Sequence, residues 1–487
     1  MMKLDKYQQK VLDTYRTTNK NIFVSATAGS GKTTTLVQLA NATPPARRAI
    51  FLAFNKSIAE ELSSRLPSTV KASTLHSCGL SSFLKAYHCN IAVNEAKYFT
   101  IAEKGLDWKG VHPKRIPGLC MKISRIYDLM RFNLVAPDVP DIIALADRYG
   151  EDVNEDIAER AIKLYMKDTA DMERFFAGGC SGKLTMDYTD MLYYTVKYLE
   201  DSDMKHYNVV MLDESQDISP LQYSLVKKLR TPHGRTVAVG DAKQSIYSFM
   251  GSNLDSLHEI QNAPNTVVLP LSVTYRCAMD IVDEAAKVFP GEIFSAPNAI
   301  KGSVSYGDYM NAEGGDYIIC RNNAPLVEAF LKLIKKGKKC TILGKELGDE
   351  LVGMIDSVGS IYDFERMLDD IIRKLMKKGV KNPMKTEKYE KADEKVAILL
   401  DLYDYFGDLD TVRSKIHEIF VANADNTGII LSTIHKSKGL EARNVYFLCP
   451  ELLPSKYAST ELELYAEKCL KFVGITRAKE NLIYCQK

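Results

Sequence analysis

The stretch Asn21-Ile-Phe-Val-Ser-Ala-Thr-Ala-Gly-Ser-Gly-Lys-Thr-Thr34 joins a short apolar run to a glycine-rich turn that ends in a lysine and two threonines. The run is typical of a buried strand, and Thr34–Ala40 after the turn has the pattern of a helix. Ala26–Thr33 fits the phosphate-loop pattern, with Ala26 in place of the first glycine. In such a loop, main-chain N–H groups at the start of the helix surround phosphates. The sequence therefore predicts a strand, a loop and a helix that bind a nucleotide.

Two side chains of this loop have distinct expected roles. Lys32 is expected to reach the terminal phosphates, and the hydroxyl group of Thr33 is expected to hold Mg²⁺. The expected cofactors are ATP and Mg²⁺. The loop residues predicted to surround the nucleotide are Ala26, Ala28, Gly29, Ser30, Gly31, Lys32, Thr33 and Thr34.

An acidic pair follows a second apolar run. Asp213 and Glu214 come directly after Val209–Leu212, at the expected carboxyl end of a strand, where α/β sheets bind ligands. We predict that Asp213 holds Mg²⁺ and that Glu214 orients or deprotonates the attacking water. Such a pair alone is more often a solvated acidic edge. Together with the phosphate loop it favours a catalytic site.

Three further polar residues are candidates for contacts with the phosphates. Gln244, in Gly-Asp-Ala-Lys-Gln-Ser at 240–245, follows the next expected strand and is placed to sense the terminal phosphate; the alternative is a loop-capping glutamine. Arg276 and Arg477 are candidate cationic groups, and an arginine of this kind accelerates phosphoryl transfer about 10³- to 10⁵-fold. The alternative for each is a surface arginine.

Short apolar runs recur along the chain and predict an α/β fold with parallel sheets. The first series lies at 49–54, 209–212, 236–239 and 266–269, and the second at 317–320, 340–343, 428–432 and 445–448. Helix-like sequence interrupts each series. The expected boundaries are 1–86 and 186–270 for a first domain, 87–185 for its helical insertion, 271–345 and 425–487 for a second domain, and 346–424 for a reduced insertion.

Composition limits the choice of partners and compartment. The 487 residues carry 64 basic and 62 acidic side chains, so any nucleic-acid binding must come from local patches. The ten cysteines are scattered without a Cys-x-x-Cys pair, which favours a reducing compartment. No apolar run reaches the roughly 18 residues of a membrane span, and the first residues lack a signal-peptide core. We expect a soluble intracellular protein without a membrane partner, in the cytoplasm or nucleoid, or in a eukaryotic nucleus.

Aromatic and histidine side chains suggest how a nucleic acid strand is held. Tyr247 and Phe249 follow Gln244 closely and are suitable stacking platforms for bases, although such a pair is also typical of a core. His76 and His435 are candidate donors to phosphates or bases, or structural histidines. The basic segments 109–125 and 373–395 are more readily interpreted as solvated faces.

The motifs together resemble those of superfamily I DNA helicases of the UvrD/Rep kind, over nearly the whole chain. The segments that carry the resemblance are Leu4–Gln8, the phosphate loop, Ser73–Ser77, Leu212–Asp217, Gly240–Gly251, Thr274–Arg276, Ser432–Glu441 and Val473–Ala478. The sequences of Phe54–Glu60 and Thr74–Ser77 look most like those of the F-box DNA helicase subgroup, although we identify no F-box before Leu4.

The resemblance implies two RecA-like parallel-sheet domains that form an ATP cleft. It implies that Gln8 contacts adenine, that Glu441 contacts the ribose, and that Arg276 and Arg477 touch the γ-phosphate. The residues assigned to the DNA strand are Phe54, Asn55, Thr74, His76, Tyr247, Phe249 and His435. The family usually has an arginine where this chain has Met250, so one expected DNA contact is missing.

The functional hypothesis is an ATP-dependent DNA helicase of replication, recombination or repair. It moves 3′ to 5′ on single-stranded DNA and unwinds duplexes at single-strand/duplex junctions. Replication or recombination proteins are candidate partners, and a monomer is expected. The alternatives are a translocase that displaces proteins from single-stranded DNA with little unwinding, and a slow nucleotide-gated DNA-binding protein or loader.

Overall fold

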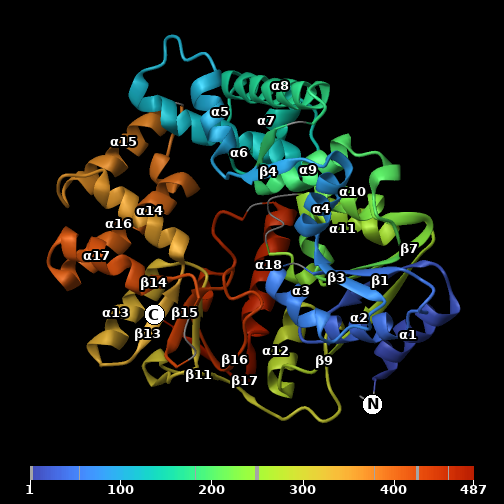
Figure 1. Cartoon of the computed structure of the whole chain (residues 1–487). Coiled ribbons are helices and arrows are strands. Elements are labelled where there is room, and N and C mark those ends of the chain that lie inside the picture. The colour runs from blue at the N-terminus through green and yellow to red at the C-terminus, as the bar shows by residue number, and fades with distance from the viewer. Residues whose placement is uncertain are drawn as a thin grey trace. The chain divides into compact units, whose positions relative to one another are not determined.

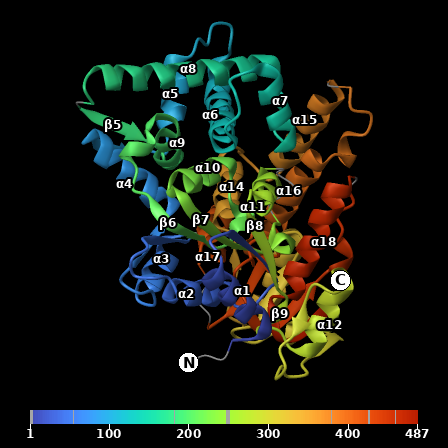
Figure 2. The ribbon, with the colours of Figure 1, turned by 90° about the vertical axis from the view of Figure 1, so that its right-hand side faces the viewer.

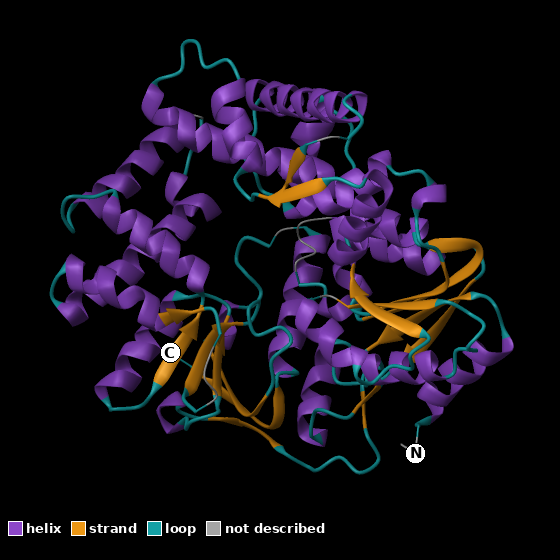
Figure 3. Cartoon of the chain, in the orientation of Figure 1, coloured by secondary structure: helices purple, strands orange, loops and turns teal. Residues whose placement is uncertain are grey.

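The computed structural model describes residues 4–53, 55–180, 182–246, 252–377, 379–423, 427–458 and 460–486. The chain divides into two compact units, Met1–Ser272 and Val273–Lys487. Each unit contains one large parallel sheet with helices packed against it (Figures 1 and 3). The predicted α/β class with two RecA-like parallel sheets is confirmed.

The first sheet has six parallel strands, and its four central strands bury side chains on both faces. In spatial order the strands are β3 (Val70–Thr74), β2 (Ala49–Ala53), β6 (Tyr207–Leu212), β7 (Arg230–Gly240), β1 (Asn21–Ala26) and β8 (Thr266–Leu271). Alternate residues of one strand enter different cores: Phe23 packs into one, and Ile22 and Val24 into the other. This two-sided burial explains why these strands are continuous apolar runs in the sequence.

Helices cover both faces of the first sheet (Figure 2). One face packs against α1 (Lys6–Thr17), α2 (Lys32–Asn41) and α3 (Lys56–Ser63). The other packs against α4 (Leu75–Tyr87), α9 (Tyr188–Tyr198), α10 (Pro220–Lys228) and α11 (Ser252–Asn262). The phosphate-loop helix and the helix after β3 therefore begin at the same edge of the sheet, because all its strands are parallel.

The helical segment of the first unit has a core of its own. Its helices are α5 (Lys97–Gly105), α6 (Ile116–Asn133), α7 (Val139–Arg148) and α8 (Glu155–Ala177). They bury a separate apolar cluster that includes Ile123, Tyr127 and Leu164. The strands β4 (Asn90–Val93) and β5 (Lys183–Met186) form a two-stranded parallel sheet. In the chain, β4 precedes α5 and β5 follows α8. The sequence did not predict this small sheet.

Buried charges join this helical segment to α9. Lys97 Nζ lies 2.7 Å from Asp190 Oδ2 and 3.2 Å from Asp168 Oδ1. Arg131, whose side chain is about 1% exposed, contacts Asp187 at 2.7 Å and Asp190 at 2.5 Å. Burial raises the pKa of Asp190 to about 6, although Arg131 and Lys97 act in the opposite direction. Buried ion pairs therefore join the helices to the sheet domain, together with apolar packing of Met172 and Phe176 of α8 against its core.

The second sheet has seven parallel strands. In spatial order they are β11 (Ser303–Tyr306), β17 (Ala478–Cys485), β16 (Ala442–Leu448), β12 (Tyr317–Cys320), β15 (Ile429–Thr433), β13 (Cys340–Leu343) and β14 (Phe420–Val421). A short ladder of β9 (Val273–Thr274) and β10 (Phe294–Ser295) lies outside it. Strands β12, β13, β15 and β16 are those that the second series of apolar runs predicted.

The helices of the second unit divide between the two faces of its sheet. On one side, α12 (Met279–Val288) packs against α18 (Glu461–Ile475) and β17. The other side carries α13 (Ala324–Lys335), α14 (Lys345–Asp356), α15 (Asp363–Lys377), α16 (Glu387–Phe406) and α17 (Leu409–Ile419). Phe364, Leu402 and Ile416 from these helices belong to the same buried cluster as Ile318 and Leu431 of the sheet. The predicted insertion 346–424 thus shares its core with the sheet.

Candidate functional site

Three loops meet at the carboxyl edge of the first sheet. They follow β1, β6 and β7, and these strands lie side by side in the order β6-β7-β1. The first loop contains Lys32, the second Asp213 and Glu214, and the third the single turn Ala242–Gln244. Parallel topology therefore assembles residues that are separated by about two hundred positions in the sequence.

The phosphate loop and the acidic pair are in direct contact. Thr33 Oγ1 donates a hydrogen bond of 2.6 Å to Asp213 Oδ2. Lys32 Nζ donates to Glu214 Oε2 at 2.8 Å, which is also an ion pair. The structure thus brings together the four residues that the sequence assigned to the phosphates, the metal and the attacking water.

The electrostatics of this contact are those of a buried charged cluster. Burial raises the pKa of Asp213 to about 6, and the charge of Glu214 adds to the effect. Burial alone would lower the pKa of Lys32, but the carboxylates of Glu214, Asp241 and Asp213 outweigh it and raise this pKa above its ordinary value. Lys32 is therefore fully charged at neutral pH, and the buried carboxylate of Asp213 favours a nearby cation.

The loop before α2 has the backbone of an anion cradle. Gly29 and Gly31 adopt left-handed φ angles of 68° and 77°, which favour glycine. Ala26 and Ala28 are buried, and Thr34 lies in the first turn of α2. The hydroxyl groups of Ser30 and Thr27 are buried and have no hydrogen-bond partner among the described residues.

The oxygen ligands and main-chain N–H groups of this site fit a magnesium–nucleotide complex. Mg²⁺ prefers oxygen ligands and commonly binds through one or two protein groups together with phosphates. The hydroxyl of Thr33 and the carboxylate of Asp213 are such oxygens and are already adjacent. Backbone N–H groups at the start of α2 supply the matching anion site.

A buried glutamine links the second and third loops. Gln216 Nε2 donates to Glu214 Oε2 at 2.6 Å, and Gln216 Oε1 accepts from the main-chain N–H of Asp241 at 3.0 Å. Gln244 in turn donates to Asp241 Oδ2 at 2.7 Å. The sequence analysis did not assign Gln216 or Asp241. Their position inside the motifs of Glu214 and Gln244 was the only signal available.

Gln8 lies beside the phosphate loop. It belongs to a capping box at the start of α1, in which Asp5 accepts from the main-chain N–H of Gln8 and Gln8 Oε1 accepts from that of Asp5. A Cβ atom at Gly31 would lie 3.1 Å from Gln8 Nε2. The structure therefore places Gln8 next to the loop; its contact with adenine stays a prediction.

Two residues assigned to DNA in this unit cap helices. Asn55 Oδ1 accepts from Ile58 N at the start of α3, and Thr74 Oγ1 accepts from Ser77 N at the start of α4. Caps of this kind stabilise a helix by about 1 kcal/mol, so both side chains already have a structural role.

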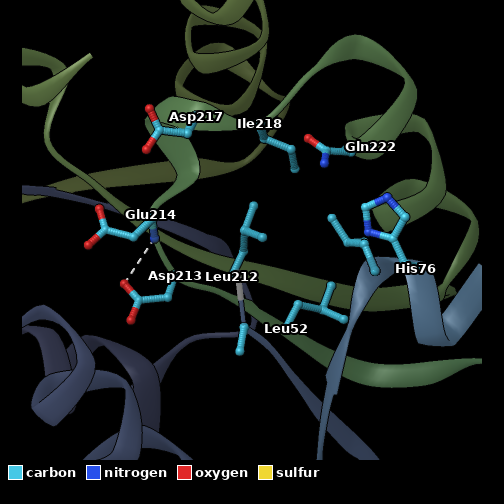
Figure 4. Close-up of a pocket in the computed structure, with 10 residues that line it drawn as sticks. Leu52, His76, Leu212, Asp213, Glu214, Asp217, Ile218 and Gln222 are labelled. Carbon is cyan, nitrogen blue, oxygen red and sulfur yellow. Dashed lines mark hydrogen bonds between the residues drawn. The ribbon is translucent and has the colours of Figure 1, made fainter. Parts of the chain in front are cut away.

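His76 lines a small pocket that also reaches the acidic pair. Figure 4 shows its ring at the opposite side of the pocket from Asp213 and Glu214, with Leu52 and Leu212 between them. Burial lowers the pKa of His76, so the ring is neutral at pH 7. The other residues assigned to DNA in this unit, Phe54, Tyr247 and Phe249, lie outside the described residues, as does Met250.

The second unit holds Arg276 and Glu441 in one ion-pair network. Arg276 Nε lies 2.5 Å from Glu441 Oε2, and Lys479 Nζ lies 2.7 Å from Glu441 Oε1. Burial opposes the charged form of Glu441, but Lys479 and Arg276 outweigh it and lower the pKa of this carboxyl. Lys479 was not among the residues predicted from the sequence.

Arg477 is held by acceptors of its own unit. Its side chain is fully buried, and it donates to Val473 O at 3.0 Å and to Leu440 O at 2.9 Å. These bonds fix the guanidinium group between the end of α18 and the segment before β16. The role of Arg477 at the γ-phosphate stays a prediction.

His435 follows β15 and lies near Arg321. Burial lowers the pKa of His435 to about 4, and the charge of Arg321 contributes. Arg321 itself pairs with Glu467 at 2.9 Å. His435 is therefore neutral at physiological pH and acts through hydrogen bonds rather than charge in any contact with a nucleic acid.

Comparison with known proteins identifies two family models. The description "UvrD/REP helicase N-terminal domain" matches residues 4–265, and "UvrD-like helicase C-terminal domain" matches residues 315–487. The first match alone covers more than half of the chain.

Similar curated proteins carry helicase names. F-box DNA helicase protein 1 of Schizosaccharomyces pombe is 24% identical over 94% of this chain and 55% of its own length. F-box DNA helicase 1 of Gallus gallus is 21% identical over 100% of this chain and 49% of its own length. The ATP-dependent DNA helicase PcrA of Leuconostoc citreum is 23% identical over 57% of this chain and 38% of its own length. The chain thus spans about half the length of the curated F-box relatives that it matches.

Within the described ranges, no helix combines the length and the apolar character that a membrane crossing requires.

Proposed function

We propose that this protein, which belongs to the UvrD/REP helicase family, hydrolyses ATP and uses that reaction to move 3′ to 5′ on single-stranded DNA and to unwind duplexes. The observation that carries the proposal is the contact between the phosphate loop and the acidic strand end. Lys32 and Thr33 meet Glu214 and Asp213 at 2.8 and 2.6 Å, which brings together the residue types that bind phosphates and Mg²⁺ in phosphoryl transfer.

Each residue of this contact has a role in hydrolysis. Thr33 and Asp213 would hold Mg²⁺, which neutralises charge on the terminal phosphates when bound. Lys32 binds those phosphates through its ammonium group. Glu214 accepts a proton from the attacking water or orients it, and Gln216 fixes the carboxylate of Glu214 for this task.

The second unit supplies further positive charge and part of the nucleotide selectivity. Arg276 and Arg477 stabilise the charge that develops on the transferred phosphate, and Glu441 binds the ribose. In this proposal Gln8 binds adenine. Arg276 leaves Glu441, and Arg477 exchanges main-chain acceptors, in the state that hydrolyses ATP.

Coupling to DNA follows from the link between Glu214 and Gln244. The hydrogen bonds through Gln216 and Asp241 connect the acidic pair to the turn that precedes Tyr247. A change at the phosphates therefore reaches a segment assigned to base stacking. Directed movement requires that DNA affinity differ between nucleotide states, since a ligand bound equally in both shifts nothing.

The test compares two partial duplexes that differ only in the polarity of a single-stranded tail. We expect DNA-stimulated ATP hydrolysis and strand separation on the 3′-tailed duplex, with the 5′-tailed duplex left paired. Lys32→Ala is the control and should remove both activities. Unwinding only from the 5′ tail would contradict the polarity, and hydrolysis indifferent to saturating single-stranded DNA would contradict a motor.

A further inference from the structure

The second unit has a groove between α12 and α18 that none of the roles above uses. From α12 it is lined by Glu284, Lys287 and Val288, and from the loop after β16 by Leu453 and Pro454. From α18 it is lined by Glu461, Leu464, Tyr465, Glu467, Lys468 and Lys471. Most of the α18 residues recur at helical spacing, so they form one continuous stripe along the helix.

The two ends of the groove differ in chemistry. The apolar end is formed by Leu464, which is 41% exposed, together with Leu453 and Pro454. The basic end is formed by Lys468 and Lys471 on α18, and Lys287 on α12 lines the same groove. Because Leu464, Leu453 and Pro454 line the same groove, they form a small apolar patch rather than isolated exposed residues.

Two acidic residues of the groove are engaged by other groups, although the charge of Lys471 also helps to lower the pKa of Glu284. Glu284 accepts from Lys287 Nζ at 2.7 Å and from the hydroxyl of Tyr484 at 3.0 Å. Glu467 is engaged with Arg321 at 2.9 Å and with the main-chain N–H of Ser455 at 2.9 Å. Within the part of the chain that the structure describes, neither Lys468 nor Lys471 forms an ion pair.

We propose that this groove is a docking site for a short acidic peptide segment of a partner protein, with apolar side chains at one end and carboxylates at the other. The apolar residues of the peptide contact Leu464, Leu453 and Pro454, and its carboxylates pair with Lys468 and Lys471. The stripe from Glu461 to Lys471 spans about 15 Å of helix, which matches roughly five residues of extended chain.

A nucleic acid strand fits the groove less well. Its phosphates would run along the whole groove and meet Glu461 at the apolar end, where they would be repelled. A peptide whose carboxylates lie at one end only avoids Glu461. The aliphatic side chains of Leu453 and Pro454 also offer no stacking surface for bases.

The test uses fluorescein-labelled eight-residue peptides and the full chain. One peptide has four acidic residues followed by four apolar residues, a second has the reverse order, and a third alternates the same residues. A fluorescent oligothymidylate serves as the nucleic acid probe. We expect one of the two segregated peptides to bind at least tenfold more tightly than the alternating one, and the affinity to fall as salt rises.

The variants separate the groove from general electrostatics. The double variant Lys468→Glu and Lys471→Glu should weaken peptide binding at least tenfold. Leu464→Ser should weaken it severalfold, while Lys335→Glu with Lys336→Glu, at the exposed end of α13, should leave it unchanged. Thermal melting and ATP hydrolysis should match the parent in all of them, which shows that each variant is folded.

Three results would overturn the proposal. The first is equal binding of the segregated and alternating peptides or no binding by any of them, and the second is equal affinity in the Lys468/Lys471 double variant. The third is loss of oligothymidylate binding alone in that variant, which would assign the groove to the nucleic acid strand. None of these outcomes depends on whether the protein hydrolyses ATP.

Discussion

The two units hold their charged site residues in different ways. In the first unit, Lys32 and Glu214 lie on separate loops and meet each other at 2.8 Å. In the second unit, Arg276 pairs with Glu441 beside it and Arg477 donates to main-chain oxygens. The first unit is therefore already arranged for a nucleotide and a metal. The second unit holds its arginines on partners that belong to the same unit.

The helical segments show a parallel difference. Helices α5 to α8 have their own apolar core and are joined to α9 by buried ion pairs such as that of Lys97 with Asp190. Helices α14 to α17 share the core of the second sheet. The first helical segment is thus a separate subdomain that buried ion pairs join to α9. The second helical segment is a part of its sheet domain.

The largest effect is expected at the first unit's contact. Lys32→Ala removes the ammonium group that binds the terminal phosphates, so ATP hydrolysis should fall about 10³-fold or more. Steady-state hydrolysis with saturating single-stranded DNA measures this. Lys20→Ala, on the loop before β1, is a matched control and should retain activity.

The link through Gln216 should come next in size. Gln216→Ala frees the carboxylate of Glu214, and kcat should fall about 10²-fold with little change in KM, because Gln216 acts through Glu214. Gln216→Glu keeps the size but repels Glu214 and should not restore activity. An unchanged kcat in Gln216→Ala would show that Glu214 needs no such support.

The sequence predicted the elements whose chemistry is local. The apolar runs of β1, β6 and β12 predicted buried parallel strands, and the phosphate loop predicted the start of α2. The strand β3, Val-Lys-Ala-Ser-Thr, was not predicted because it lies at the sheet edge and alternates with polar residues. The strand β17, which lies between β11 and β16, was also not predicted, because its first half is polar.

The parts that escaped prediction depend on distant partners. Lys97 and Asp190 are 93 positions apart, and in the sequence each is an ordinary surface charge. The roles of Gln216 and Lys479 are visible only when the strand ends are brought together. The acceptors that hold Arg477 are main-chain oxygens, which no residue pattern reveals.

Replacing Arg276 or Arg477 of the second unit should change the free energy of unfolding by different amounts. Arg477→Ala leaves buried main-chain acceptors without donors and should lower the free energy of unfolding by about 3 kcal/mol. Arg276→Ala removes one partner of Glu441, which keeps Lys479, and should change stability by less than about 1 kcal/mol. Chemical denaturation of both variants measures the difference. Similar values for the two would contradict the distinction drawn between them.

The smallest effect concerns the pH dependence of stability. Because the pKa of Asp213 is raised to about 6 in the folded protein, its carboxyl binds a proton more tightly there than in the unfolded chain. The stability that this group contributes is present below about pH 4 and is lost as the pH rises through 6. Without nucleotide and Mg²⁺, Asp213→Asn should therefore stabilise the protein by ~2 kcal/mol at pH 8 and by less at pH 5. Denaturation at the two pH values is the measurement, and a destabilised variant at pH 8 would contradict the account.

The contrast between the units is tested most directly by measuring nucleotide binding and single-turnover hydrolysis in the same Arg276→Ala protein. If the first unit holds the nucleotide and the second unit supplies charge for hydrolysis, Mg²⁺–ATP should bind within a few fold of the parent while the hydrolysis step slows about 10³-fold or more. Hydrolysis at the parental rate, or a loss of binding as large as the loss of hydrolysis, would contradict this division of roles.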